Sequence, residues 1–189
     1  FSSYDAKKGG EFYTPKKISN LLAKIVVDED IKSVYDPTCG TGSLLLEVNK
    51  ELKENATLYG QEINPTSYNL CRMGMILSGE DNAQIYNADT LKGDTFEESK
   101  RFDAIVSNPP YSLKNWNTNE LDSTHYYFKN GVVPPKSKGD MAFILHSFHH
   151  LSYHGKMAIV LPPGILYRGG AEGKIRTYLT PYIESVIML

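Results

Sequence analysis

The sequence predicts an α/β fold, in which a mostly parallel β-sheet carries helices on both of its faces. Three observations support this fold class. Short apolar runs of strand length alternate with segments of helical spacing, the pattern of parallel strands joined by right-handed crossovers. The length of 189 residues, 41% hydrophobic and 22% charged, suits a single globular domain. Motifs of unusual composition follow successive predicted strands, where ligands bind in such sheets.

The first predicted element is a helix that ends at Val26, because apolar residues recur from Ile18 with helical spacing. Thr14 and Pro15 are expected as its N-cap and first residue. Further predicted helices comprise residues 43–52, 65–77, 141–151 and 175–179, with Asp140 as the cap of the third. The predicted strands are short apolar runs bounded by turn-forming residues, at 33–35, 57–63, 83–87, 102–107, 156–161 and 184–189.

Residues 112–139 form a polar, turn-rich segment that is long for a loop in a compact domain, which predicts a functional or mobile loop. Within it, residues 126–128 (Tyr-Tyr-Phe) suit either a strip that stacks on DNA bases or an ordinary loop anchor. Four histidines, His146, His149, His150 and His154, are spaced like metal ligands. They fall opposite the apolar stripe of their helix, so we expect a solvated face and no metal site.

The net charge of −2 excludes a strongly basic nucleic-acid coat, so DNA binding would need local cations or a partner. Basic side chains that suit phosphate contacts, or simple surface charge, are Lys136, Lys138, Arg168, Lys174 and Arg176. The two cysteines are too few for a disulfide framework and favour a reducing, cytoplasmic setting. Cys39 is expected to be a small loop residue and Cys71 a core residue. The chain contains no apolar run long enough to cross a bilayer.

A glycine loop at residues 36–42 (Asp-Pro-Thr-Cys-Gly-Thr-Gly) joins a predicted strand to a helix. It lacks the three spaced glycines of a dinucleotide fingerprint and the lysine of a phosphate loop. Its leading acid, Asp36, would repel phosphate but accept a cationic ligand. Glu62 ends the next strand, where an acid binds ribose hydroxyls, and Asp89 follows the third, where it can accept an adenine amine. These features predict a nucleoside site; the alternative is turn glycines and solvated carboxylates.

Residues 108–111, Asn-Pro-Pro-Tyr, end the fourth predicted strand and are called the lip below. Two prolines lack backbone donors and fix the direction of the chain, so the strand must stop there. The side-chain oxygen of Asn108 and the carbonyl of Pro109 can each accept an N–H, and Tyr111 can stack on a ring. The lip therefore suits a flat ring that carries an amine. The alternative is a strand followed by a proline-rich turn.

The order of the segment 10–15, the Asp36 loop, Glu62, Asp89 and the lip resembles amino-group DNA methyltransferases that use S-adenosylmethionine. More narrowly, residues 134–143, 155–162 and 168–176 resemble the modification subunit of type I restriction–modification systems. The resemblance covers nearly the whole chain and implies the Rossmann-like fold of S-adenosylmethionine-dependent methyltransferases. It also implies a tail of a helical region at residues 1–9 and a catalytic domain at 10–189. That family continues past the sixth strand into a strand pair that supplies the second wall for the base, so a chain truncated at both ends is expected.

The resemblance assigns residues 11–16 to the methionine end of the cofactor, with Thr14 near its carboxylate. It places Asp36 near the ammonium, Glu62 on the ribose and Asp89 on the adenine amine. The full implied cofactor set is Glu11, Phe12, Tyr13, Thr14, Pro15, Lys16, Asp36, Pro37, Gly40, Thr41, Gly42, Ser43, Glu62 and Asp89. The implied catalytic set, which holds the target adenine, is Asn108, Pro109, Pro110 and Tyr111, and no metal is implied.

The implied function is methylation of adenine N6 in DNA on a flipped-out base. The implied partners are DNA, a specificity subunit, a restriction subunit and a second modification subunit, in the cytoplasm of a bacterium or archaeon. Two alternatives stay open. One is a methyltransferase that acts on a protein glutamine or an RNA base, because those enzymes share the tetrapeptide. The other is a non-catalytic module with a decayed site, against which the intact acids and glycines argue.

Overall fold

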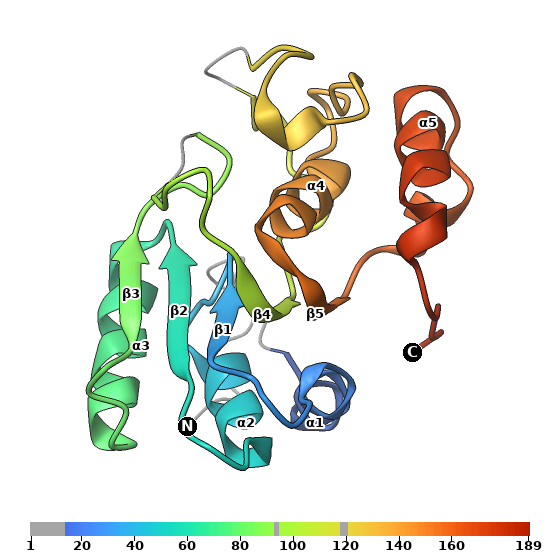
Figure 1. Ribbon diagram of the computed structural model, residues 1–189. Helices are drawn as coiled ribbons and strands as arrows, with labels where there is room; N and C mark the ends of the chain where they lie inside the picture. Colours follow the sequence, from blue (N-terminus) through green and yellow to red (C-terminus); the bar gives the residue numbers. More distant parts are fainter. Residues whose placement is uncertain (1–13, 93–94, 118–120) are drawn as a thin grey trace.

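The computed structural model describes residues 14–92, 95–117 and 121–189, and its centre is a five-stranded sheet (Figure 1). The strands lie in the order β3-β2-β1-β4-β5, and every neighbouring pair is parallel. This arrangement confirms the predicted parallel sheet. The order reverses between β1 and β4, and such a switch point is where open α/β sheets bind ligands. The strands are β1 (Ser33–Asp36), β2 (Thr57–Glu62), β3 (Gln84–Asn87), β4 (Phe102–Ser107) and β5 (Leu151–Ile159).

Helices α1 (Lys16–Val26), α2 (Ser43–Glu51) and α3 (Pro65–Leu77) cover one face of the sheet (Figure 1). They bury the alternate aliphatic residues of the central strands against their own apolar stripes. Cys71 is fully buried in this core, as predicted. The core residues contributed by the strands are Val34, Leu58, Ala104 and Val106.

The opposite face is covered by α4 (Asp140–His150), with α5 (Gly170–Leu179) beside it (Figure 1). On this side Tyr35 and Phe102 stack, and Phe96 packs against both rings. The long loop adds to the same side through the short helix η1 (Tyr126–Phe128). Tyr127 and Phe128 are buried, so η1 is a loop anchor and not a strip open to DNA bases.

Several predicted boundaries need correction. Pro15, not Thr14, is the N-cap residue of α1, and no side chain caps that helix. Asp140 is the first residue of α4 and Gly139 is its N-cap, and the Asp140 carboxylate bonds to another segment. β5 begins at Leu151, directly after α4. Residues 184–189, predicted as a sixth strand, form no strand; they are exposed and pair with no neighbour in the sheet.

The predicted solvated histidine face is also wrong for three of its four members. His146, His149 and His150 are buried because α4 packs against both the sheet and the segment that precedes β4. His146 Nε2 bonds to the Tyr35 hydroxyl at 2.8 Å. His149 and His150 bond to backbone carbonyls of that segment at 3.0 and 2.9 Å. His154, on β5, is exposed.

Within the described ranges, no helix combines the length and the apolar character needed to cross a bilayer.

Candidate active site

The carboxyl ends of the parallel strands bring the predicted motifs to one edge of the sheet. Asp36 ends β1, Glu62 ends β2, and the lip follows Ser107 at the end of β4. A hydrogen bond of 2.8 Å between the hydroxyls of Thr38 and Ser107 joins the glycine loop to β4. The loop and the lip therefore form one continuous edge across the switch point.

The glycine loop depends on two backbone conformations that other residues rarely adopt. Gly40 has φ 53° and Gly42 has φ 81°. A Cβ on Gly42 would lie 2.7 Å from both Cys71 Sγ and Met75 Cε, so the loop can approach α3 only with a glycine there. The Cys39 N–H donates to the Gln61 carbonyl at 2.9 Å and fixes the loop on β2.

Two carboxylates converge under this loop. The Asp36 side chain is 2% exposed and accepts the Thr38 N–H at 2.9 Å. Burial, and to a smaller extent the nearby Glu62 carboxylate, raises the pKa of Asp36 to about 7 against the hydrogen bonds from Thr38. Glu62 accepts the N–H groups of Gly40 at 2.9 Å and Asn64 at 2.7 Å. A cation placed here would favour the ionised form of Asp36, which fits the ammonium of a ligand.

The third acid, Asp89, lies two residues beyond β3, which ends at Asn87 as predicted. The Asp89 carboxylate accepts the Leu91 N–H at 3.1 Å and lies 3.4 Å from Lys92 Nζ. Asn87 donates through Nδ2 to the carbonyls of Glu62 and Ile63, which ties the ends of β2 and β3 together. Glu62 and Asp89 thus belong to neighbouring strand ends, as predicted.

Ile63 is a candidate site residue that the sequence analysis did not single out. It directly follows Glu62 at the same edge and is 61% exposed. An apolar residue that separates a strand-ending acid from the helix-capping Asn64 is the signal that identifies it. An exposed aliphatic side chain beside the acids suits the face of a nucleoside base.

The lip is held by side-chain bonds at both ends of the Asn108 amide. Asn108 Nδ2 donates to Thr14 Oγ1 at 3.0 Å, and the Tyr111 hydroxyl donates to Asn108 Oδ1 at 3.0 Å. Pro109 is buried and Pro110 exposed, while Tyr111 is 40% exposed. Thr14, predicted at the cofactor carboxylate, thus also contacts the predicted base-binding residue.

The remaining predicted cofactor residues are distributed as follows. Pro37 is buried and its carbonyl accepts the Thr90 hydroxyl. Thr41 is exposed in the loop, and Ser43 is the first residue of α2. Pro15 and Lys16 are exposed at the start of α1. Glu11, Phe12 and Tyr13, together with the predicted tail at residues 1–9, lie outside the described residues.

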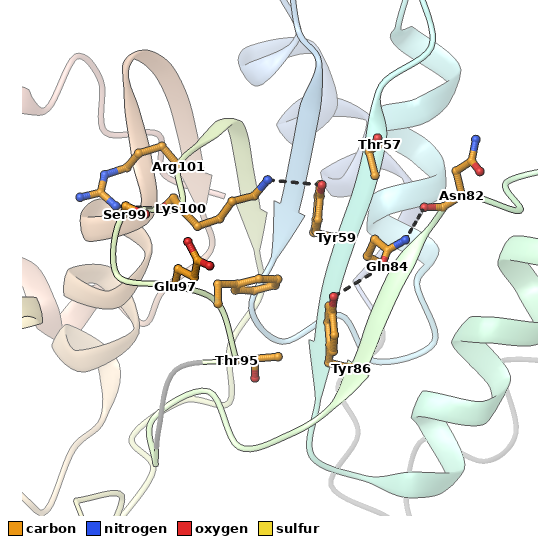
Figure 2. A pocket seen from close by; sticks show the side chains of 11 residues that line it. Thr57, Tyr59, Asn82, Gln84, Tyr86, Thr95, Glu97, Ser99, Lys100 and Arg101 are labelled. Atoms are coloured by element: carbon orange, nitrogen blue, oxygen red, sulfur yellow. Dashed lines mark hydrogen bonds between the residues drawn. The ribbon is translucent and has the colours of Figure 1, made fainter.

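An open cleft of about 790 Å³ lies elsewhere, toward the amino ends of β2 and β3 (Figure 2). Figure 2 shows Lys100 above the ring of Tyr59, with Tyr86 and Gln84 on the neighbouring strand. None of the predicted site residues lines this cleft. We place the site at the carboxyl edge, because the glycines, acids and lip converge there.

The described ranges hold no cluster of three or more histidine, cysteine, aspartate or glutamate side chains arranged to bind a metal. Cys39 and Cys71 are free thiols, with their sulfur atoms 3.9 Å apart beneath the glycine loop.

Comparison with known proteins decides the family. The model of the N-6 DNA Methylase family matches residues 1–189. The chain belongs to the N-6 DNA methylase family. Among curated relatives of this methylase chain, the type I restriction enzyme MpnII methylase subunit of Mycoplasma pneumoniae is 46% identical, over 97% of this chain and 37% of that protein. The chain therefore spans little more than a third of that relative.

Solved structures agree with this assignment. The methyltransferase subunit of a type I restriction–modification system from Streptococcus thermophilus is 42% identical, with a TM-score of 0.83. The match covers 90% of this chain and 38% of that subunit. A Listeria monocytogenes protein assigned to the class I S-adenosylmethionine-dependent methyltransferases is 17% identical, with a TM-score of 0.71 over 91% of this chain and 53% of its own. The latter shows a shared fold. The expected Rossmann-like S-adenosylmethionine-dependent methyltransferase fold is confirmed.

Proposed function

We propose that the protein to which this chain belongs transfers a methyl group from S-adenosylmethionine to N6 of adenine in DNA. We propose further that it acts as the modification subunit of a type I restriction–modification complex. One observation carries the proposal: the lip is joined to the segments proposed for the cofactor. Asn108 of the lip bonds directly to Thr14, and Ser107, the residue before the lip, bonds to Thr38 of the glycine loop. An acceptor amine held by the lip would lie beside that cofactor.

The residues at this edge fit S-adenosylmethionine. The buried acid Asp36 suits the ammonium, and Glu62 keeps lone pairs for ribose hydroxyls beyond its two backbone bonds. Ile63 suits one face of the adenine, and Asp89 its amine. When bound, the cofactor supplies the sulfonium methyl group that is transferred.

The lip supplies positioning. An adenine within a duplex is flipped out before its amine can react. The amine lone pair is delocalised into the ring, so acceptors at Asn108 Oδ1 and the Pro109 carbonyl would hold the N–H bonds and turn the lone pair toward the methyl. In the free protein Oδ1 accepts the Tyr111 hydroxyl. Base capture therefore exchanges that bond for one from N6, and the Tyr111 ring can stack on the base.

We propose DNA as substrate, with a specificity subunit to read the sequence and a restriction subunit and a second modification subunit in the complex. The net charge of −2 supports a separate DNA-reading subunit, because a mildly acidic chain needs cations from elsewhere to hold DNA.

Product analysis tests the reaction class. The full-length protein, purified with the neighbouring gene product that reads DNA, is incubated with isotopically labelled S-adenosylmethionine and DNA, ribosomal RNA or a glutamine-containing protein substrate. We expect labelled N6-methyladenine from DNA, detected by mass spectrometry of the digested nucleosides. Label in glutamine or in an RNA base, with none in DNA, would identify the alternative class. Cofactor binding without transfer to any of the three would indicate a decayed site.

A further inference from the structure

Asp140 is a buried acid that the proposed chemistry does not use. It is 1% exposed and begins α4. An acid in the first turn of a helix ordinarily serves that helix's own amides. Here Oδ1 accepts the Ser112 N–H at 2.6 Å and Oδ2 lies 2.9 Å from Arg168 Nη1. The two carboxylate oxygens thus bind Ser112, the residue that follows the lip, and Arg168, which precedes α5.

Ser112 is the residue directly after Tyr111, and its backbone has φ 52°. Residues other than glycine rarely adopt this left-handed conformation, because the Cβ atom makes it unfavourable. Hydrogen bonds from other segments therefore help to hold Ser112 in it. The bond to Asp140 is one of them. The Gly139 N–H donates to the Leu113 carbonyl at 2.9 Å, which holds the next residue to the segment before α4. The turn at Ser112 therefore fixes the direction in which the chain leaves Tyr111.

Arg168 is held in place for this contact. Its Nη1 lies 3.2 Å from Glu172, which is 4% exposed, and its own carbonyl accepts Arg176 Nη1 at 2.9 Å. A Cβ on Gly164 would lie 2.4 Å from the Arg168 guanidinium, so the side chain lies directly over that glycine. Arg168 and Arg176, which the sequence offered for phosphate contacts, are used within the fold.

We propose that Asp140, paired with Arg168, is a positioning residue for capture of the target base. It holds the left-handed turn at Ser112 and thereby the place of the Tyr111 ring. The proposal rests on the proposed function, because the base is what the lip would hold. The glycine loop and Glu62 are fixed by other bonds, so the loss of Asp140 should leave cofactor binding largely intact.

The test uses the full-length protein in its complex, with 2-aminopurine as a fluorescent reporter at the target position. Asp140→Ala should weaken base capture about tenfold, the scale of one lost charged hydrogen bond. Asp140→Asn keeps an acceptor for Ser112 but loses the charge that faces Arg168, so its effect should be smaller. It also serves as the test if the alanine variant does not fold. The affinity for S-adenosylmethionine should stay within about twofold in both. Thr177→Ala, on the exposed side of α5, is the matched control.

Rescue separates a positioning role from general support of the fold. Glycine adopts the left-handed conformation freely, so adding Ser112→Gly to Asp140→Ala should restore part of the base capture. Hydrogen exchange in a peptide that contains Ser112 should be faster in Asp140→Ala. Equal losses of cofactor affinity and base capture without rescue, or unchanged capture, would overturn the proposal. If the wild type captures no base but the exchange difference persists, the proposed function fails and the turn-holding contact stands.

Discussion

The two halves of the candidate site are held together in different ways. In the cofactor half, formed by the ends of β1, β2 and β3, the key bonds run from backbone N–H groups of the glycine loop to the end of β2, as from Cys39 to the Gln61 carbonyl and from Gly40 to the Glu62 carboxylate. In the lip half, formed by the lip, α4 and α5, side chains distant in sequence make the bonds. Thr14 and Asn108 are 94 residues apart, and Asp140 and Ser112 are 28 residues apart.

This difference determines how each half should respond to change. The cofactor half needs particular backbone shapes, such as the left-handed Gly42. The lip half needs a set of remote partners, among them Thr14 and Asp140, and should therefore weaken when any one of them is altered. Helix α4, which begins at Asp140, in turn depends on the contacts of its buried histidines. The predictions below test that division.

The largest expected effect on stability is a loss in acid that arises from α4. Burial, together with the smaller effects of the His150, Arg101 and Lys129 charges, lowers the pKa of His149 to about 4 against its hydrogen bond to the Glu98 carbonyl. An unfolded histidine binds its proton near pH 6.5, so the folded state loses stability as pH falls from there toward 4. By pH 5 the free energy of unfolding should fall by about 2 kcal/mol from this group.

Urea unfolding at pH 7.5 and pH 5 measures that loss. His149→Gln should remove about 2 kcal/mol of the difference between the two pH values. His154→Gln, at an exposed position of β5, is the control and should leave the difference as in the wild type. An unchanged acid response in His149→Gln would show that α4 does not carry this sensitivity.

A smaller effect is expected from Thr14, and its measurement shows to which half of the site this residue belongs. Thr14→Val keeps the shape of the side chain but removes the hydroxyl that accepts Asn108 Nδ2. The methyl-transfer rate of the full-length protein should fall about tenfold, the value of one hydrogen bond of roughly 1.4 kcal/mol. The affinity for S-adenosylmethionine should change less.

Thr14→Ser, which keeps the hydroxyl, is the matched control and should retain most of the rate. The resemblance to modification subunits instead places Thr14 at the cofactor carboxylate. A loss of cofactor affinity in Thr14→Val with an unchanged rate would support that role and remove Thr14 from the lip half.

The sequence predicted the cofactor half better than the lip half, because the cofactor half depends on strand ends and the lip half on contacts between distant segments. Strand ends in a parallel sheet meet at one edge, so Asp36 and Glu62 could be placed together from the alternation of elements alone. Helix α3 was predicted with its observed bounds because Asn64 and Pro65 mark its start. Such signals are local, and the sequence contains them in full.

Contacts between distant segments left no such signal. Asp140 was predicted as an ordinary helix cap, because nothing local reveals that Ser112 takes its Oδ1. The histidines of α4 were placed in solvent because helical spacing shows an apolar stripe but not what packs on the other side. His146 faces Tyr35 and the segment before β4 covers His149, and both contacts depend on the tertiary fold.

The most direct test of the division between the two halves is the Asn108→Ala variant of the full-length protein. Its affinity for S-adenosylmethionine is measured by calorimetry, and its rate of N6-methyladenine formation by mass spectrometry. Asn82→Ala, at an exposed position at the far cleft, is the matched control. We predict an affinity within about twofold of the wild type and a rate at least about 100-fold lower. A near-normal rate, or a loss of affinity as large as the loss of rate, would contradict the account.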